Sequence, residues 1–282
     1  MRLIVNADDF GLCRSVNKAI IDVYKAGNLS STTMMVTMPG ADDAITLAKR
    51  HPNLGIGLHL CLTEGRSLAD HSTLTNENGY FFSRSELIKK VLKGNIDLKE
   101  IRTEFEYQLE ELSRSGIPYF HVDSHQHVMM WPEIFSAIDP ILTERNLHAR
   151  VVRPPMPPYN LAISKPSKYA KSLMNIRFSG KIKKRTKVQT NDYLVSIHDL
   201  KDQGNVSSKT YLELLDPIPK NKVTEVMVHP YILNKELMDM YASSIATKKP
   251  FLAKCEKEYQ ILSGPPIFAD HDLITYKDLI QK

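Results

Sequence analysis

Residues 3–11 read Leu-Ile-Val-Asn-Ala-Asp-Asp-Phe-Gly, a short stretch that changes from apolar to acidic side chains. The run Leu3–Ala7 has the length and composition of a buried strand. A helical pattern follows over Ser15–Ala26, and Gly27 is a suitable stop for that helix. We therefore predict a strand whose end carries two carboxylates, followed by a helix.

The same order of strand and helix recurs along the chain. Further strand-like runs occupy Ser31–Met38, Leu54–Leu62, Ile117–Val122, Ala149–Val152, Tyr193–Ile197 and Val223–Val228. Helical patterns lie between the earlier runs, over Ala41–Arg50, Leu98–Ser113 and Pro132–Arg145. Strands separated by helices form right-handed βαβ units with a parallel sheet. Seven such strands favour an α/β fold with a complete or incomplete (β/α) barrel, and a doubly wound open sheet is the alternative.

No internal repeat or clear linker divides the chain, so we expect one catalytic domain over residues 1–282. The least regular part lies around residues 154–190. Four prolines fall within residues 154–158, and nine basic residues without any acidic one lie between Lys165 and Lys187. We expect a basic insertion loop here, which extends over the mouth of the barrel.

Composition excludes several classes of protein. The chain has 282 residues, 42% of them hydrophobic, and three cysteines without a Cys-x-x-Cys pair, which argues against a disulfide scaffold or a cysteine-type zinc finger. The net charge is +5, but the basic run contributes +9, so the remaining residues carry −4. This balance weakens a nucleic-acid interpretation, which needs a basic face. Since no signal peptide or apolar run of about 18 residues is visible, we expect a cytoplasmic protein that does not bind membranes.

Polar side chains lie at or near the ends of five of the expected strands. They are Asp8 and Asp9, His59, the segment Asp123-Ser124-His125-Gln126-His127, Arg153 and His229. The carboxyl ends of parallel barrel strands share one face, where active sites form. One carboxylate with two imidazoles is a recognised open site for a divalent cation. The sequence therefore predicts a metal-containing active site at this face.

Each of these residues also has an ordinary structural interpretation. The two aspartates could form a turn or a helix N-terminus, and His59 could be a hydrogen-bonded core residue. The histidines after Asp123 could be solvated loop residues. Arg153 could form a surface ion pair, and His229 could be a capping or core histidine. These alternatives stay open for each residue taken alone.

Four motifs together resemble the YdjC-like carbohydrate deacetylases, which include chitooligosaccharide deacetylases. They are Asn6-Ala7-Asp8-Asp9-Phe10-Gly11, Gly57-Leu58-His59-Leu60-Cys61-Leu62-Thr63, His121-Val122-Asp123-Ser124-His125-Gln126-His127 and Val226-Met227-Val228-His229-Pro230. The resemblance implies a distorted or incomplete (β/α) barrel similar to those of polysaccharide deacetylases and glycoside hydrolases. It also implies a cytoplasmic, often dimeric enzyme that removes acetyl groups from N-acetylated sugars such as chitooligosaccharides.

The resemblance also implies roles for individual residues. The ligands of one divalent ion, magnesium or zinc, would be Asp9, His59 and His125. Asp8 would be the general base, His229 the acid, and Arg153 the residue that positions the base. We further expect His127 and Asp123 to bind substrate. Met129 stands where the family often has another histidine, so no role is assigned to that position.

Two other functions remain as alternatives. A metal-dependent phosphoesterase or sugar-phosphate hydrolase could use the same Asp-His-His site, although most such enzymes add a second metal about 3.5–4 Å away. A nucleic-acid-binding protein could use the segment Lys165–Lys187, but no recognisable motif supports it. That segment either attracts a phosphorylated sugar or is a solvated loop. We expect a small acetylated sugar as the substrate and a second copy of the chain as partner.

Overall fold

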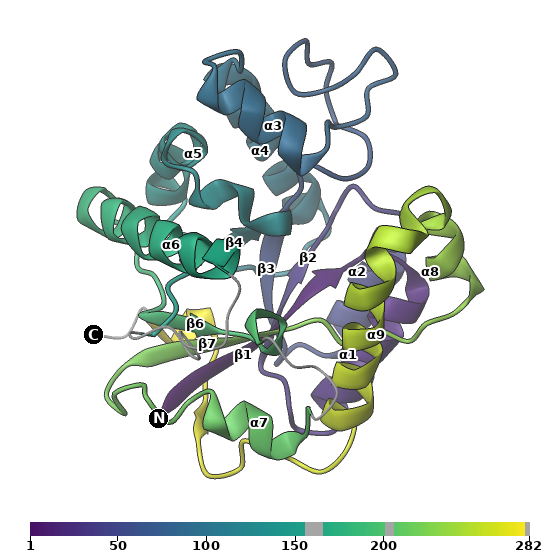
Figure 1. Ribbon diagram of the computed structural model, residues 1–282. Coiled ribbons are helices and arrows are strands. Elements are labelled where there is room, and N and C mark those ends of the chain that lie inside the picture. Colours follow the sequence, from purple (N-terminus) through teal and green to yellow (C-terminus); the bar gives the residue numbers. More distant parts are fainter. Residues whose placement is uncertain (156–165, 201–205, 280–282) are drawn as a thin grey trace.

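The strands form one curled, parallel sheet in the computed structural model, which describes residues 1–155, 166–200 and 206–279 (Figure 1). The strands are β1 (Arg2–Phe10), β2 (Ser31–Met34), β3 (Gly55–Leu60), β4 (His121–Ser124), β5 (His148–Ala149), β6 (Tyr193–Val195), β7 (Val223–Val228) and β8 (Asp272–Leu273). Seven of them follow the order β5-β4-β3-β2-β1-β7-β6, and β8 pairs with the start of β1. The predicted incomplete (β/α) barrel is therefore confirmed.

The curl of the sheet brings its two edge strands together. Ala149 of β5 forms a single parallel bridge with Thr190, just before β6. The amide of Leu194 in β6 donates a hydrogen bond of 2.9 Å to the carbonyl of Arg153. These contacts link the two edge strands, but they do not form a continuous ladder of hydrogen bonds. As a result, the polar residues at the ends of the strands face a common space.

β1 shows why the strands appear as apolar runs in the sequence. Alternate residues of a strand face opposite sides. Leu3, Val5 and Ala7 pack in the main core, whereas Ile4 belongs to a smaller cluster with residues near the C-terminus. The side of β1 that carries Ile4 continues with Asn6 and Asp8, both buried. The interior of the barrel is therefore polar toward the carboxyl ends of the strands.

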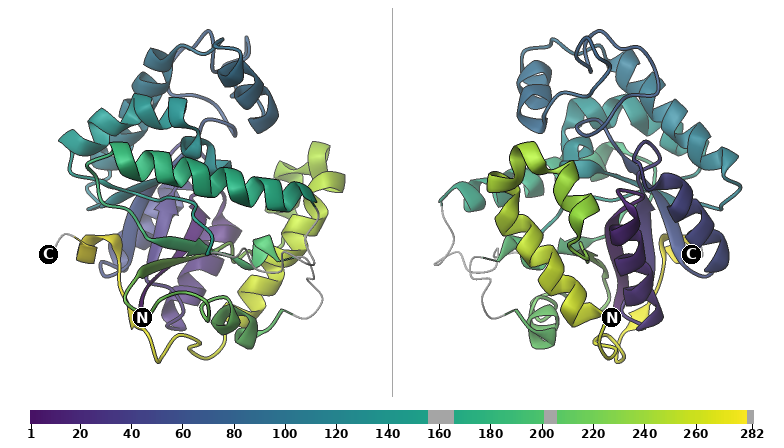
Figure 2. Two further views of the ribbon diagram at one scale, coloured as in Figure 1. Left: turned by 60° about the vertical axis from the view of Figure 1, so that its left-hand side comes forward. Right: turned by 90° about the vertical axis from the view of Figure 1, so that its right-hand side faces the viewer.

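Helices cover the outside of the sheet (Figure 2). They are α1 (Arg14–Lys25), α2 (Ala41–Arg50), α3 (Arg84–Leu92), α4 (Leu98–Arg114), α5 (Pro132–Glu144), α6 (Pro166–Arg185), α7 (Ser208–Glu213), α8 (Lys235–Met240) and α9 (Ile245–Leu262), with 3₁₀ turns η1 (His125–Met130), η2 (Ile197–Asp199), η3 (Ala242–Ser244) and η4 (Tyr276–Leu279). The four helices predicted from the sequence correspond to α1, α2, α4 and α5. Their buried faces match the apolar periodicity.

The expectation of a basic insertion loop around residues 154–190 is wrong for most of that stretch. Twenty of its residues, Pro166–Arg185, form α6, and Lys165 lies outside the described residues. Lysine and arginine are good helix formers, so a run of positive charge is no evidence against a helix. The single catalytic domain over residues 1–282 stays a prediction.

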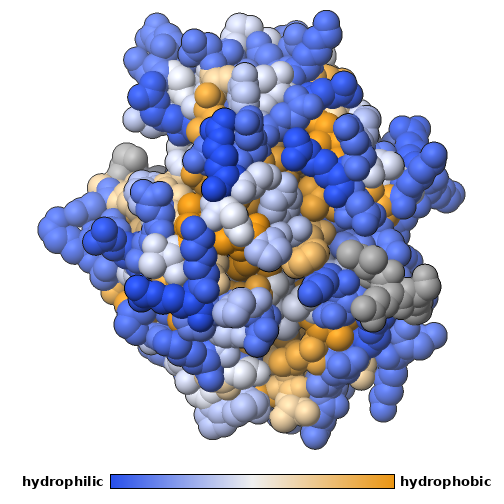
Figure 3. Space-filling view, turned by 180° about the vertical axis from the view of Figure 1, so that it is seen from behind, coloured by the Kyte–Doolittle hydropathy of each residue, from blue (hydrophilic) through white to orange (hydrophobic). Residues whose placement is uncertain are grey.

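On the face shown in Figure 3, hydrophilic residues dominate and hydrophobic areas lie between them. None of the helices in the described part of the chain is long and apolar enough to cross a membrane. The expected homodimer and the cytoplasmic location stay predictions.

Candidate active site

The end of β1 places two buried carboxylates at the mouth of the barrel. Asp9 has a φ of +68°, so the strand turns there and the side chains of Asp8 and Asp9 both line one cavity. Gly11 completes the turn at a φ of +99°, where an added Cβ would lie 2.7 Å from the carbonyl oxygen of Met35. This position therefore requires glycine.

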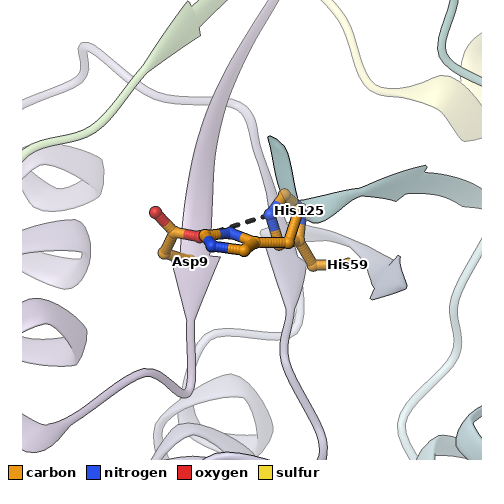
Figure 4. Close-up of side chains that lie close together, drawn as sticks. All are labelled: Asp9, His59 and His125. Carbon is orange, nitrogen blue, oxygen red and sulfur yellow. Dashed lines mark hydrogen bonds and ion pairs between the residues drawn. The ribbon is translucent and has the colours of Figure 1, made fainter. Parts of the chain in front are cut away.

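Three potential metal ligands converge beside this turn (Figure 4). Oδ1 of Asp9 lies 3.2 Å from Nε2 of His59, on β3, and 3.1 Å from Nδ1 of His125, which follows β4. None of the three residues is more than 8% exposed. The structure thus brings together the three residues that the sequence analysis named as ligands of one cation.

His59 is held in place by Asp123, the residue beside it in the β3–β4 ladder. Nδ1 of His59 lies 2.7 Å from Oδ1 of Asp123, and the hydroxyl of Thr33 donates to Oδ2 of the same carboxylate. Asp123 is fully buried and does not line the cavity. The expectation that Asp123 binds substrate is therefore not supported, because its carboxylate is occupied by His59, Thr33 and Arg150.

Replacing Asp123 by Asn should weaken cation binding without removing a ligand. The amide keeps the size of the carboxylate but loses its charge, and such partners of ligand histidines are typically worth about 10- to 100-fold in metal affinity. Isothermal titration with zinc would measure the change. An affinity equal to that of the unchanged protein would contradict this role for Asp123.

Asp8 is paired with Arg150 rather than with Arg153. The two terminal nitrogens of Arg150 donate bidentately to Asp8 at 2.6 and 2.7 Å. Arg150 also lies 2.5 Å from Asp123 and from Glu225. The guanidinium of Arg153 lies instead over the ring of Tyr193, 5.3 Å from its centroid. The expected positioning role of Arg153 is therefore corrected to Arg150.

Burial and charge set the protonation of this cluster. Burial alone would raise the pKa of Asp8, but Arg150 holds that pKa well below its usual range. Burial alone would lower the pKa of His59, but Asp123 and Asp9 raise it to about 10. The carboxylates thus favour a positive charge beside Asp9, and Asp8 stays ionised at neutral pH.

His229 approaches Asp8 from the neighbouring strand. It follows β7, which pairs with β1, and its Nε2 lies 3.8 Å from Oδ2 of Asp8. Burial and the neighbouring His198 lower the pKa of His229. The imidazole and the carboxylate therefore line the same cavity as the three metal-ligand candidates.

The loop after β4 places His127 at the cavity as well. Gln126 and His127 both have positive φ, 55° and 57°, which is uncommon for residues other than glycine. Nε of Arg84, on α3, donates to the carbonyl of Gln126 at 3.1 Å and braces this turn. His127 lines the cavity, and its expected contact with substrate stays a prediction.

Comparison with known protein families gives a match over most of the chain. The profile of the family described as YdjC-like protein matches residues 2–271. The chain belongs to the YdjC-like family. The resemblance inferred from four motifs is therefore confirmed.

Relatives of this YdjC-like protein carry names that describe an activity. A carbohydrate deacetylase of Geobacillus stearothermophilus is 31% identical over 98% of this chain and 96% of its own length. A chitooligosaccharide deacetylase of Yersinia pestis is 33% identical over 84% of both chains. A crystal structure described as a cellobiose-phosphate cleavage protein of Enterococcus faecalis has a TM-score of 0.74 and 24% identity, covering 99% of this chain and 98% of that chain. The similarity to this crystal structure shows the fold alone.

The cavity of the YdjC-like chain has a volume of about 560 Å³, within the range of small-molecule sites. Lys171 of α6, which belongs to the basic segment expected over the mouth of the barrel, lines this cavity. Three other residues at the cavity were not predicted. Lys248 and Lys254 lie at its wall on α9, and the hydroxyl of Tyr231 donates to Oδ2 of Asp9. Tyr231 could have been found from the sequence, because it lies two residues after His229 at the end of the same strand. The two lysines of α9 could not, because the approach of this helix to the strand ends is a tertiary feature.

Proposed function

We propose that this protein is a metal-dependent deacetylase that hydrolyses the N-acetyl group of small sugars of the chitooligosaccharide type and releases acetate. The observation that carries the proposal is the convergence of an Asp-His-His donor set with an arginine-paired carboxylate and a second histidine in one cavity. The names of the curated relatives support an acetylated sugar as the substrate.

The residues fit one divalent cation. Asp9, His59 and His125 offer one oxygen and two nitrogen donors within 4.8 Å of one another, a set that suits zinc and leaves coordination positions open. Nδ1 of His59 is directed to Asp123, so Nε2 is the atom left to bind a cation. When bound, a divalent cation would lower the pKa of water and polarise the acetyl carbonyl.

The chain itself supplies the proton transfers. Ionised Asp8 accepts a proton from the water that attacks the carbonyl carbon, and Arg150 keeps the carboxylate oriented and charged. As the bond between the carbonyl carbon and nitrogen breaks, His229 donates a proton to the departing sugar amine. The short path between Nε2 of His229 and Asp8 allows the proton taken from water to return to the amine.

The direct test is acetate release from N-acetylglucosamine oligomers, with and without a chelator. We expect release by the untreated protein, loss after dialysis against EDTA, and recovery on addition of zinc or magnesium. Elemental analysis should find one ion per chain. Two ions per chain, together with release of phosphate from sugar phosphates and no acetate, would instead support a phosphoesterase.

A further inference from the structure

A buried glutamate behind His229 connects three segments of the chain. Glu258 lies on α9 and is fully buried. Its Oε2 accepts hydrogen bonds from the backbone amide of His229 at 2.6 Å and from Nε2 of His198 at 2.9 Å, while Oε1 accepts one from the hydroxyl of Tyr211. We infer that Glu258 and His198 are positioning residues for His229, an inference that rests on the proposed function.

The hydrogen bonds fix the backbone that carries His229. α9 binds the segment 229–231 at two points, through Glu258 and through the carbonyl of Cys255, which accepts from the amide of Tyr231 at 3.1 Å. The same segment ends at the tyrosine that contacts Asp9. The distance from His229 to Asp8 and Asp9 is therefore set from α9.

Ring contacts fix the orientation of the His229 imidazole. The ring of His198 meets it edge-on at 4.8 Å, and that of Phe251 at 5.4 Å. Nδ1 of His229 is buried and forms no hydrogen bond with the described residues. The ring is thus held by packing and by its backbone, with Nε2 toward Asp8.

Glu258 also contributes charge. Among the described residues, its only ion pair is with His198. One oxygen of its carboxylate lies within 4.8 Å of one ring nitrogen of His198 and one ring nitrogen of His229. A buried negative charge at this distance favours the protonated form of His229, which is the form that an acid needs. The charged or titratable groups that influence His229 from the surrounding elements are Asp8, Asp9, His127, His198 and Glu258.

The variant Glu258→Gln distinguishes a role of Glu258 in positioning His229 from a general role in stability. The amide oxygen can still accept from the backbone of His229, but the negative charge is lost. We expect kcat to fall about tenfold or more with little change in KM. The pKa of His229 should fall by about one pH unit. Because the acid must be protonated, the alkaline limb of the kcat profile should move to lower pH by a similar amount.

A second variant and a control complete the design. His198→Gln keeps a donor for Glu258 but removes the ring beside His229 and the neighbouring group that lowers the pKa of His229. We therefore expect kcat to fall and the alkaline limb to move to higher pH, opposite to its movement in Glu258→Gln. Glu104→Gln is the matched control. Glu104 is equally buried and pairs with His71 at 3.0 Å, but it does not line the cavity. It should lower thermal stability and leave the pH profile unchanged.

Two results would overturn the inference. One is a Glu258→Gln variant with an unshifted pH profile and a His198→Gln variant with unchanged kcat. The other is binding of a second zinc ion that His198→Gln abolishes, because the cluster would then be a metal site. Titration of the His229 ring by NMR, assigned with His229→Gln, reports the same pKa shift without any substrate. The inference thus remains testable even if no acetylated sugar is hydrolysed.

Discussion

Replacing Asp8 by Asn is expected to reduce kcat for acetate release by about 10³-fold while the cation stays bound. Asn is nearly the same size as Asp and can still accept from Arg150 through its one oxygen, so the site should keep its shape. It cannot take a proton from water. Steady-state kinetics with an N-acetylglucosamine oligomer, together with elemental analysis of the purified variant, would measure both quantities.

The neighbouring aspartate is the matched control for this experiment. Asp9→Asn changes the same chemical group one residue later, but Asp9 lies between His59 and His125 rather than against Arg150. We expect this variant to lose the cation and, for that reason, activity. Loss of the cation in Asp8→Asn, or its retention with full activity in Asp9→Asn, would show that the two roles are assigned to the wrong residues.

The different roles proposed for these two aspartates show what the local sequence can predict and what it cannot. The barrel and the polar residues at its strand ends were predictable, because these groups lie at or near the ends of apolar runs and parallel strands end on one side. The roles of adjacent residues depend on which way each side chain points. The positive φ of Asp9 decides this, and it belongs to a turn in which Gly11 lies close to the carbonyl oxygen of Met35.

Residues inside the barrel were harder to predict than residues at its rim. Arg150 lies within the expected strand Ala149–Val152, whereas Arg153 lies at its end, and the rule that favours strand ends selected the wrong arginine. A charged residue within an apolar run was the available signal. Arg150 is almost completely buried, and such an arginine requires carboxylate partners. Its partners Asp8 and Glu225 are 142 and 75 residues away in sequence.

Contacts made by later helices were not predictable from strand patterns. Glu258 reaches His229 only because α9 packs against the end of β7, and neither the spacing nor the composition of α9 indicates this contact. Asp123 was named for its place among the histidines, but strand alternation turns it toward His59 within the barrel. The candidate site residues were therefore identifiable from residue types, whereas the partners of these residues required the tertiary structure.

The largest loss of stability is expected from Arg150→Met. Arg150 has three buried carboxylate partners, Asp8, Asp123 and Glu225. Methionine fills a similar space but leaves these charges without a cation. Removing one partner of a buried ion pair typically costs about 3–5 kcal/mol of unfolding free energy. Urea denaturation at pH 7 would measure it, and Arg153→Met, which removes the stacking contact with Tyr193, should cost about 1 kcal/mol or less.

The pH dependence of that loss distinguishes charge from packing. Beside Arg150 the pKa of Asp8 lies below its unfolded value, so the pair stabilises the native protein above that value and the stabilisation is lost as the pH falls. In the variant, burial should raise the carboxylate pKa values. Burial already raises that of Glu225 to about 6 beside Arg150. The carboxylates then become protonated as the pH falls, so the stability deficit should shrink between about pH 7 and pH 5. A deficit independent of pH would mean that Arg150 acts through packing alone.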